Sequence, residues 1–201
     1  MRKFIFLLLC LTFIICLSAC RSTGAAHTET EEKSDKATEK ESVREPELET
    51  EYVNVGTNVG DLCPNLELTI LDRDEPFSIH DNRGKITVLN FWFTTCPYCI
   101  VEMPHFYDVA KEYGQKVTVI ALHANIQGVD LPKWIETNNP QLADGTVLVG
   151  WDDNYTAQIL FNVTGFPTTV ILDRNGVISD IRVGMMSRDQ LAEAIQKAMM
   201  Q

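Results

Sequence analysis

The stretch ITVLNFWFTTCPYC, residues 86–99, decides the fold of this chain. Its first part, Ile86–Phe93, is a continuous apolar run of the kind buried at the centre of a sheet. The residues that follow have helical spacing, so Cys96 and Cys99 stand at a strand-to-helix junction, where a CxxC pair indicates redox chemistry. The N–H groups and partial positive charge at a helix N-terminus stabilise a thiolate, the form that attacks disulfides. Cys99 lies one turn in, close enough to bond Cys96.

Two other interpretations of the cysteine pair are weaker. A structural staple across so short a loop removes roughly 2 kcal/mol of unfolded-state entropy, against about 4.7 kcal/mol for a long loop. A zinc site needs four ligands, but Cys20 and Cys63 are singly placed and the four histidines show no i,i+4 pairing. We therefore expect no metal and no cofactor beyond a redox-active Cys96–Cys99 disulfide. Cys63, which precedes Pro64, is predicted to be a small buried apolar residue and not a third redox thiol.

The N-terminus indicates a targeting segment. Two basic residues precede the apolar run Phe4–Leu17, which is short for a membrane span and suited to a signal peptide. The run ends in Leu17-Ser18-Ala19-Cys20, which resembles a bacterial lipobox. Residues 1–19 are thus predicted to be a lipoprotein signal peptide that carries Cys10 and Cys16 away, and Cys20 to be the lipidated mature N-terminus. An uncleaved anchor, or ordinary cleavage after Ala19, are the alternatives.

Composition divides the rest of the chain into two parts. Residues 20–52, rich in Ser, Thr, Glu and Lys, bury too little apolar surface to fold and are predicted to be a flexible charged tether. As a coil, that length reaches on the order of 30 Å. Residues 53–201 have the length of one ordinary domain. The formal net charge of −11 argues against a nucleic-acid partner, which requires a basic face.

Hydrophobic periodicity predicts alternating strands and helices. Strands are expected at 66–71, 77–80, 86–93, 117–122, 146–150, 170–172 and 177–182. Helices are expected from Cys96 to Tyr113, with a kink at Pro104, and at 131–137, at 154–161 begun by Asp152 or Asp153, and after a capping box at Ser187 and Gln190. The pattern indicates an α/β fold with a central mixed β-sheet, helices on both faces and an N-terminal β-hairpin extension.

Several short motifs occur in a telling order. They are Gly84-Lys85, Asn90-Phe91-Trp92, Cys96-Pro97-Tyr98-Cys99, Glu102-Met103-Pro104, Gly165-Phe166-Pro167-Thr168-Thr169 and Asp173-Arg174-Asn175-Gly176. On these motifs, residues 57–200 resemble the TlpA/ResA-like membrane-anchored thiol–disulfide oxidoreductases. The resemblance implies a thioredoxin-like fold and an extracytoplasmic protein, held to the cell membrane by lipid, that reduces or exchanges protein disulfides.

The resemblance also implies roles for individual residues. Cys96 is the attacking thiol and Cys99 the resolving thiol. Pro167 aligns with a cis-proline beside the disulfide, where the backbone of Phe166 pairs with an extended substrate strand. Glu102 aligns with a buried acid that tunes the thiols and accepts a proton from Cys99. The plain alternatives are a solvated Glu102 and an ordinary trans proline.

Other positions are expected to shape the substrate surface. Trp92, Pro97 and Tyr98 are candidate substrate-binding residues, with Trp92 as core or site wall. Thr95 stands where the family usually has Trp, which leaves the substrate surface open. The Pro-Tyr dipeptide is the one that glutaredoxins use, so a glutaredoxin-like protein remains an alternative. The resemblance implies protein disulfides as substrates, apocytochrome c among them, and a membrane thiol-transfer protein as electron donor.

Two further function classes share the fold. A thiol peroxidase of the peroxiredoxin type has Pro and Thr/Ser at fixed places before its cysteine, and Leu89 and Phe93 occupy those places here. A non-catalytic binding or metal-delivery module needs extra ligands near Cys96, and the sequence shows none. Assays of peroxide consumption and of disulfide reduction, run side by side, separate these classes.

Overall fold

Two neighbouring parallel strands form the centre of the sheet. The computed structural model describes residues 53–124 and 128–201, so the predicted signal peptide, Cys20 and the tether lie outside the described residues. Every residue of β3 (Ile86–Trp92) is buried, and β3 pairs in parallel with β4 (Val117–Ala124). Both strands are covered on both faces, which explains why the sequence of β3 is apolar without alternation.

The described residues form one compact unit with a seven-stranded mixed sheet in the order β2-β1-β5-β4-β3-β6-β7. The remaining strands are β1 (Glu67–Ile70), β2 (Phe77–Ser78), β5 (Leu148–Asp152), β6 (Thr168–Leu172) and β7 (Ile178–Val183). The helices are α1 (Pro97–Tyr113), α2 (Leu131–Asn138), α3 (Thr156–Leu160) and α4 (Arg188–Met199), with short 3-10 turns between elements. No helix in these residues is both long and apolar enough to cross a membrane.

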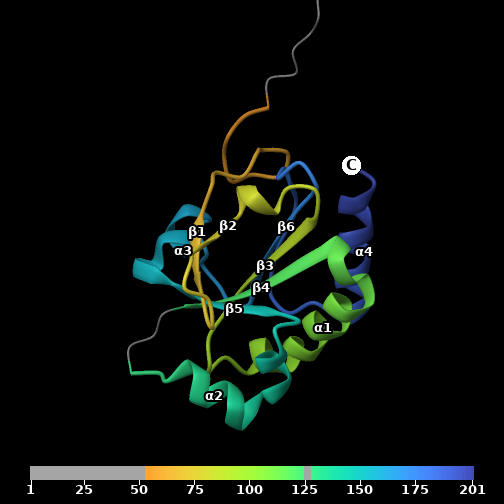
Figure 1. The fold of residues 1–201 in the computed structure, drawn as a ribbon. Coiled ribbons are helices and arrows are strands. Elements are labelled where there is room, and N and C mark those ends of the chain that lie inside the picture. The colour runs from red at the N-terminus through yellow and green to blue at the C-terminus, as the bar shows by residue number, and fades with distance from the viewer. Residues whose placement is uncertain (1–52, 125–127) are drawn as a thin grey trace, which may run out of the picture. The chain divides into compact units, whose positions relative to one another are not determined.

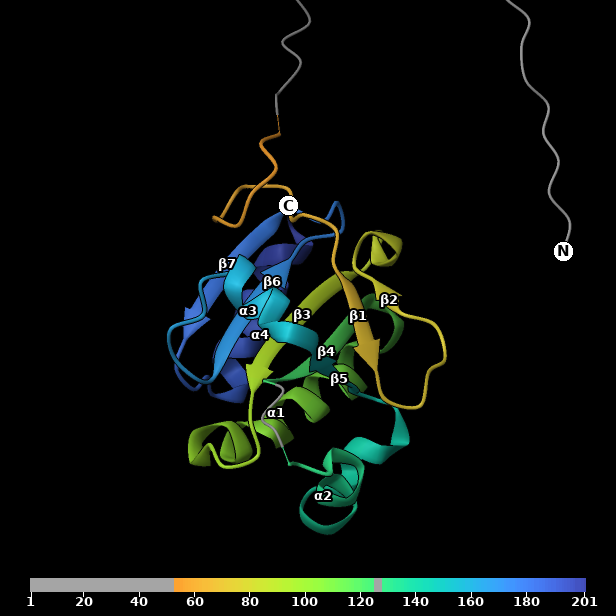
Figure 2. The same ribbon diagram turned by 90° about the vertical axis from the view of Figure 1, so that its left-hand side faces the viewer.

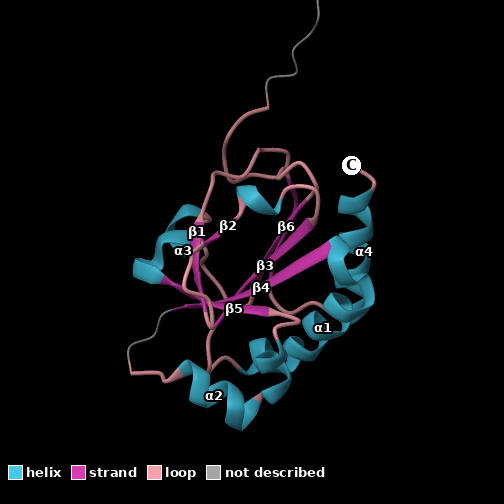
Figure 3. Cartoon of the chain, viewed as in Figure 1, coloured by secondary structure: helices cyan, strands magenta, loops and turns pink. Residues whose placement is uncertain are grey.

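Helices cover the two faces of the sheet unequally (Figures 1 and 3). The long helices α1 and α4 pack beside each other on one face, and their apolar side chains join those of α2 in one buried cluster. The opposite face is covered by the short helix α3 and by residues from the N-terminal part of the domain, including Ile79 and Cys63. Cys96 and Cys99 belong to the first cluster, so the disulfide lies on the side of the two long helices.

The predicted N-terminal hairpin extends the sheet beyond β5. β1 pairs antiparallel with β2 on one side and with β5 on the other, as Figure 2 shows. Gly150 makes this contact possible, because a Cβ at Gly150 would lie 2.5 Å from the Thr69 carbonyl oxygen. The mixed sheet, the helices on both faces and the hairpin extension are therefore all present.

Element boundaries differ from the sequence-based expectation in a few places. β5 begins at Leu148, two residues later than predicted, and β2 ends at Ser78 because the chain turns into a 3-10 helix at His80. Helix α1 continues through Pro104 to Tyr113. The capping box of Ser187 and Gln190 before α4 is confirmed.

Asp152 organises the start of α3 without being its formal N-cap. Its carboxylate accepts hydrogen bonds from the N–H groups of Ala157 and Gln158, at 2.8 and 2.9 Å. A single 3-10 turn, Asp153–Tyr155, separates Asp152 from the helix. The prediction of Asp152 or Asp153 as the N-cap is wrong in position, because Tyr155 is the N-cap residue of α3, and α3 itself is shorter than expected.

Candidate active site

The CxxC motif forms the first turn of α1. Cys96 is the N-cap residue, and its sulfur accepts a hydrogen bond of 3.2 Å from the backbone N–H of Cys99. Pro97 occupies the first helical position, where its missing N–H leaves no bond unmade. Cys96 and Cys99 form a disulfide with an S–S distance of 2.07 Å. The sulfur of Cys96 thus lies where the helix N-terminus and an N–H donor both favour a thiolate.

Exposure differs between the residues of the motif. Tyr98 is 65% exposed and Pro97 is exposed as well, whereas Cys96 is 4% and Cys99 1% exposed. Cys96 is more enclosed in the disulfide state than a freely accessible nucleophile would be. Both cysteines are buried in this state, so exposure does not distinguish an attacking from a resolving thiol. The exposed Pro97 and Tyr98 offer surface next to the attacking sulfur.

Glu102 lies one turn after Cys99 on the buried face of α1. It is 0% exposed, and both of its carboxylate oxygens accept hydrogen bonds, from the Asn90 side-chain amide at 2.9 Å and from the Met186 backbone N–H at 2.7 Å. Burial raises the pKa of Glu102 from 4.5 to about 7, and the two hydrogen bonds oppose part of that rise. The alternative of a solvated Glu102 is therefore wrong. A carboxyl group with this pKa exchanges its proton near neutral pH.

The Phe166–Pro167 peptide bond is cis, so the alternative of an ordinary trans proline is wrong. The ring of Phe166 packs edge-on against Phe93, with centroids 5.1 Å apart. The carbonyl of Phe93 accepts a hydrogen bond from the N–H of Cys96 at 3.1 Å. The segment that contains Pro167 therefore packs against the loop that leads into the cysteine motif.

Trp92 lies behind the cysteine loop, in the core. It is 0% exposed, and its ring contacts Trp134 and His123 at centroid distances of 5.4 and 5.0 Å. In this oxidised state Trp92 offers no surface to a substrate, unlike Tyr98. Trp92 therefore forms the part of the core on which the cysteine loop lies.

His123, at the end of β4, is a buried residue of the site that sequence reasoning missed. Its Nε2 accepts a hydrogen bond of 3.2 Å from the N–H of Thr94, and its ring packs edge-on against both Trp92 and Trp151. Burial lowers the pKa of His123 from 6.5 to about 4, so the ring is neutral with its proton on Nδ1. In the sequence His123 directly follows the expected strand 117–122, but no local pattern indicated its burial or its pairing in register with Trp92.

Cys63 differs from the redox pair in its place in the fold and in having no disulfide partner among the described residues. It is 0% exposed, belongs to the cluster on the opposite face of the sheet, and is the free cysteine of the described residues. Burial raises the pKa of its thiol from 9.0 to about 11. The prediction of a small buried apolar residue is confirmed. Within residues 53–124 and 128–201, no three His, Cys, Asp or Glu side chains are grouped so as to hold a metal.

Comparison with known proteins agrees with this geometry. The sequence matches the AhpC/TSA family over residues 59–181. It is 33% identical to the thioredoxin-like protein YneN of Bacillus subtilis over 70% of this chain and 81% of that protein. It is 31% identical to the thiol-disulfide oxidoreductase ResA of Oceanobacillus iheyensis, over 66% and 69% of the two chains. A structure of a DsbE-type thiol:disulfide interchange protein from Chlorobium tepidum superimposes with a TM-score of 0.61 at 23% identity, over 71% of this chain and 99% of that one.

The fold and the cysteine pair define a thiol–disulfide oxidoreductase of the thioredoxin-fold class. The chain belongs to the AhpC/TSA family. Its curated relatives lie in the ResA-like branch, in agreement with the resemblance seen in the sequence motifs.

Proposed function

We propose that this protein is an extracytoplasmic, membrane-tethered oxidoreductase that reduces protein disulfides through Cys96 and Cys99. The observation that carries the proposal is the position of the Cys96 sulfur at the N-cap of α1, bonded by the Cys99 N–H. That position favours the Cys96 thiolate, while Cys99 precedes the buried carboxyl group of Glu102 by three residues on the same helix.

The reaction runs in two exchanges. The Cys96 thiolate attacks one sulfur of a substrate disulfide, forming a mixed disulfide, and the other substrate sulfur leaves as a thiolate that takes up a proton. Glu102 in its carboxylate form accepts the proton of Cys99, whose thiolate then attacks the Cys96 sulfur. The second substrate thiolate leaves, and the Cys96–Cys99 disulfide remains. Two electrons have passed from the protein to the substrate, and a thiol donor must supply two more.

The surface around the pair suits a polypeptide substrate. Pro97 and Tyr98 are exposed beside Cys96, and Phe166 and Pro167 lie on the segment that packs against the cysteine loop. We assign these four residues to substrate contact. The names of the ResA relatives support the thiol–disulfide reaction itself, and the exposed surface beside the pair is our ground for protein disulfides as its substrates.

Membrane tethering rests on the sequence before the domain. The apolar run Phe4–Leu17 and the Leu17-Ser18-Ala19-Cys20 motif support lipidation at Cys20, and residues 20–52 supply the tether. A membrane thiol-transfer protein then serves as the electron donor. Mass spectrometry of the protein from bacterial membranes tests this: a diacylglyceryl group on Cys20 supports it, and an unmodified N-terminus at another residue contradicts it.

Trapping of intermediates tests the reaction. Cys99→Ser leaves the first exchange intact and blocks the second, so we expect mixed disulfides with oxidised insulin to accumulate on non-reducing gels. Cys96→Ser should trap far less, because Cys96 and not Cys99 is the N-cap residue whose sulfur accepts a backbone N–H. Equal trapping by both variants would contradict the assignment of roles. Faster consumption of hydrogen peroxide than of insulin disulfides by the reduced wild type would favour a thiol peroxidase instead.

A further inference from the structure

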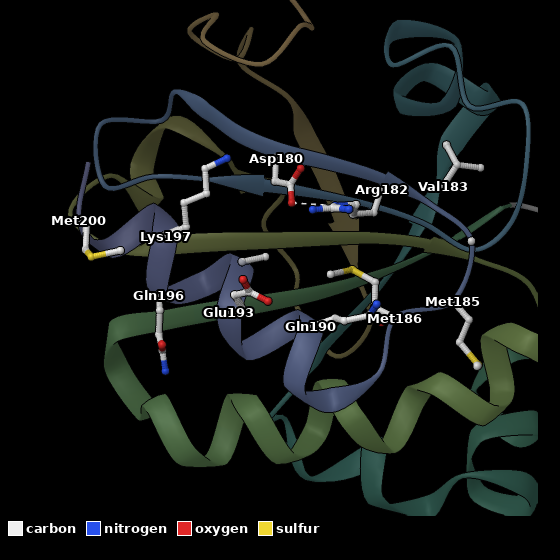
Figure 4. Close-up of a pocket in the computed structure, with 12 residues that line it drawn as sticks. Asp180, Arg182, Val183, Met185, Met186, Gln190, Glu193, Gln196, Lys197 and Met200 are labelled. Carbon is white, nitrogen blue, oxygen red and sulfur yellow. Dashed lines mark hydrogen bonds and ion pairs between the residues drawn. The ribbon is translucent and has the colours of Figure 1, made fainter.

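The segment between β7 and α4 has contacts that the proposed reaction does not yet explain. A hollow of about 640 Å³ lies between these two elements, with the ion pair of Asp180 and Arg182 on one wall. Figure 4 shows Met185 and Met186 at one end of the hollow, on the chain that leads from β7 into α4. No cysteine lines the hollow, but Met186, at one end of it, contacts a residue of the active site.

Both backbone polar groups of Met186, its N–H and its carbonyl, are hydrogen-bonded to side chains of α1. Its N–H donates to the Glu102 carboxylate at 2.7 Å, and its carbonyl oxygen lies 3.0 Å from Nδ1 of His105. Glu102 and His105 are three residues apart, so they stand next to each other on the helix surface. The Met186 side chain is 5% exposed and packs in the same cluster as Cys96 and Cys99.

The hydrogen bond to His105 has one possible direction. A carbonyl oxygen only accepts, so Nδ1 of His105 carries a hydrogen and donates a hydrogen bond to the carbonyl oxygen of Met186. This donor is present whether the ring is neutral or protonated. The hydrogen bond from His105 to Met186 therefore persists when the Glu102 carboxyl gains or loses its proton. The same segment is bound at its other end, where the N–H of Gly184 donates to the Pro167 carbonyl at 2.8 Å.

We propose that His105 is a positioning residue: by holding the Met186 carbonyl, it fixes the Met186 N–H against the Glu102 carboxylate and thereby sets when that carboxylate accepts a proton. The inference rests on the proposed role of Glu102 in the thiol exchange. It adds a residue whose side chain acts only through the backbone of Met186.

The direction of the effect follows from the surroundings of Glu102. From β3 it meets the Asn90 amide, which also bonds the Thr169 hydroxyl on β6, and from the β7–α4 segment it meets the Met186 N–H. The titratable groups of its own helix nearby are His105 and, when reduced, the cysteine pair. Within the described residues no ion pair involves Glu102, so these neutral donors are what stabilises its charged form. Loosening one of them raises its pKa.

The test follows the Glu102 carboxyl by 13C NMR in the full oxidised chain, assigned by comparison with Glu102→Gln. We expect His105→Leu to raise the Glu102 titration midpoint by about one pH unit, a tenfold change of the size that a hydrogen bond to a charged group supports. His105→Asn, which keeps a donor, should restore most of the wild-type midpoint. His80→Leu is the matched control, since His80 Nε2 bonds the Cys63 carbonyl at 2.8 Å far from Glu102 in the chain.

Three results would overturn the proposal. The first is a folded His105→Leu protein with the wild-type midpoint, and the second is an equal shift in His80→Leu. The third needs no variant: exchange of the Met186 amide hydrogen of the wild type as fast as an exposed amide would show that the bond is not held. None of these measurements uses a substrate. A wild type that reduces no disulfide would therefore contradict the proposed function and leave this result standing.

Discussion

Glu102 and His123 are both completely buried near the cysteine pair, yet their surroundings give them different uses. Burial favours the neutral form of each, raising the pKa of the carboxyl to about 7 and lowering that of the imidazole to about 4. Both oxygens of Glu102 have hydrogen-bond donors, so its charged form is accommodated. Nδ1 of His123 has no partner among the described residues.

This difference bears on the roles that the proposed mechanism gives the two groups. With a pKa of about 7, Glu102 changes its charge near neutral pH, as the proposed transfer of a proton from Cys99 requires. His123 stays neutral down to acidic pH, and its Nε2 remains free to accept the N–H of Thr94. Burial alone therefore does not suit a group to acid–base catalysis, because its charged form must also be stabilised by hydrogen-bond partners.

The largest expected effect concerns proton transfer by Glu102. Glu102→Gln removes the acid while keeping its shape, so disulfide reduction at pH 7 should fall by roughly 100-fold, the usual contribution of general acid–base catalysis. The inflection near pH 7 in the rate profile should disappear with it. Stopped-flow kinetics of insulin reduction from pH 5 to 9 measures both.

Glu112→Gln is the matched control, since Glu112 is an exposed carboxylate on the same helix that pairs with Arg188. It should leave both the rate and the profile unchanged. If His123→Phe abolished the inflection and Glu102→Gln did not, the roles in the comparison would be reversed.

The next effect concerns stability, where the two groups act in opposite directions. Glu102 binds its proton more tightly when folded, so its contribution to stability falls as pH rises from 4.5 to 7. His123 binds its proton less tightly when folded, so its contribution falls as pH drops from 6.5 to 4. Between pH 5 and 7 each contribution changes by about 2 kcal/mol, and the two nearly cancel.

Removing one of the two groups should leave the pH dependence of the unfolding free energy that the other group contributes. As pH increases from 5 to 7, we expect the unfolding free energy of Glu102→Gln to increase by about 2 kcal/mol, while that of the wild type stays nearly constant. Over the same pH range, the unfolding free energy of His123→Phe should decrease by about the same amount. Urea unfolding of the oxidised protein at several pH values measures the slopes. Parallel profiles for the wild type and both variants would show that neither group is shifted by burial.

The smallest effect concerns Cys63, a third buried titratable group. Its pKa of about 11 leaves almost no thiolate at pH 8, so iodoacetamide should modify the reduced native protein at Cys96 and spare Cys63. In urea both should react. Peptide mass spectrometry locates the label, and modification of native Cys63 at the rate of Cys96 would mean that the core opens far more readily than its burial implies.

The elements near the cysteine motif were predictable from local sequence, and the contacts between elements were not. β3 and α1 follow from an apolar run and a helical period, and both lie within a residue or so of their predicted bounds. Burial of Glu102 and the cis bond before Pro167 were expected from the family resemblance, not from periodicity. The start of β5 was misplaced by two residues, because the residues before it form a loop whose composition resembles that of a strand.

His105 and His123 show why the rest of the site was missed. Each is a single histidine whose partner lies far away in sequence: Met186 for His105 and Thr94 for His123. No local pattern indicates such a partner, since it depends on which loop the fold brings to the helix or strand. The parallel register of β3 and β4 is what sets His123 beside Trp92.

The hairpin of β1 and β2 affects how these molecules meet one another. It covers the side of β5 and leaves β2, only two residues long, as the outer strand at that end of the sheet. At the other end β7 is the outer strand, and it carries the ion pair of Asp180 and Arg182. Short edges and charged edges both resist strand-to-strand joining between copies. A domain built this way can reach a high concentration without polymerising through its sheet.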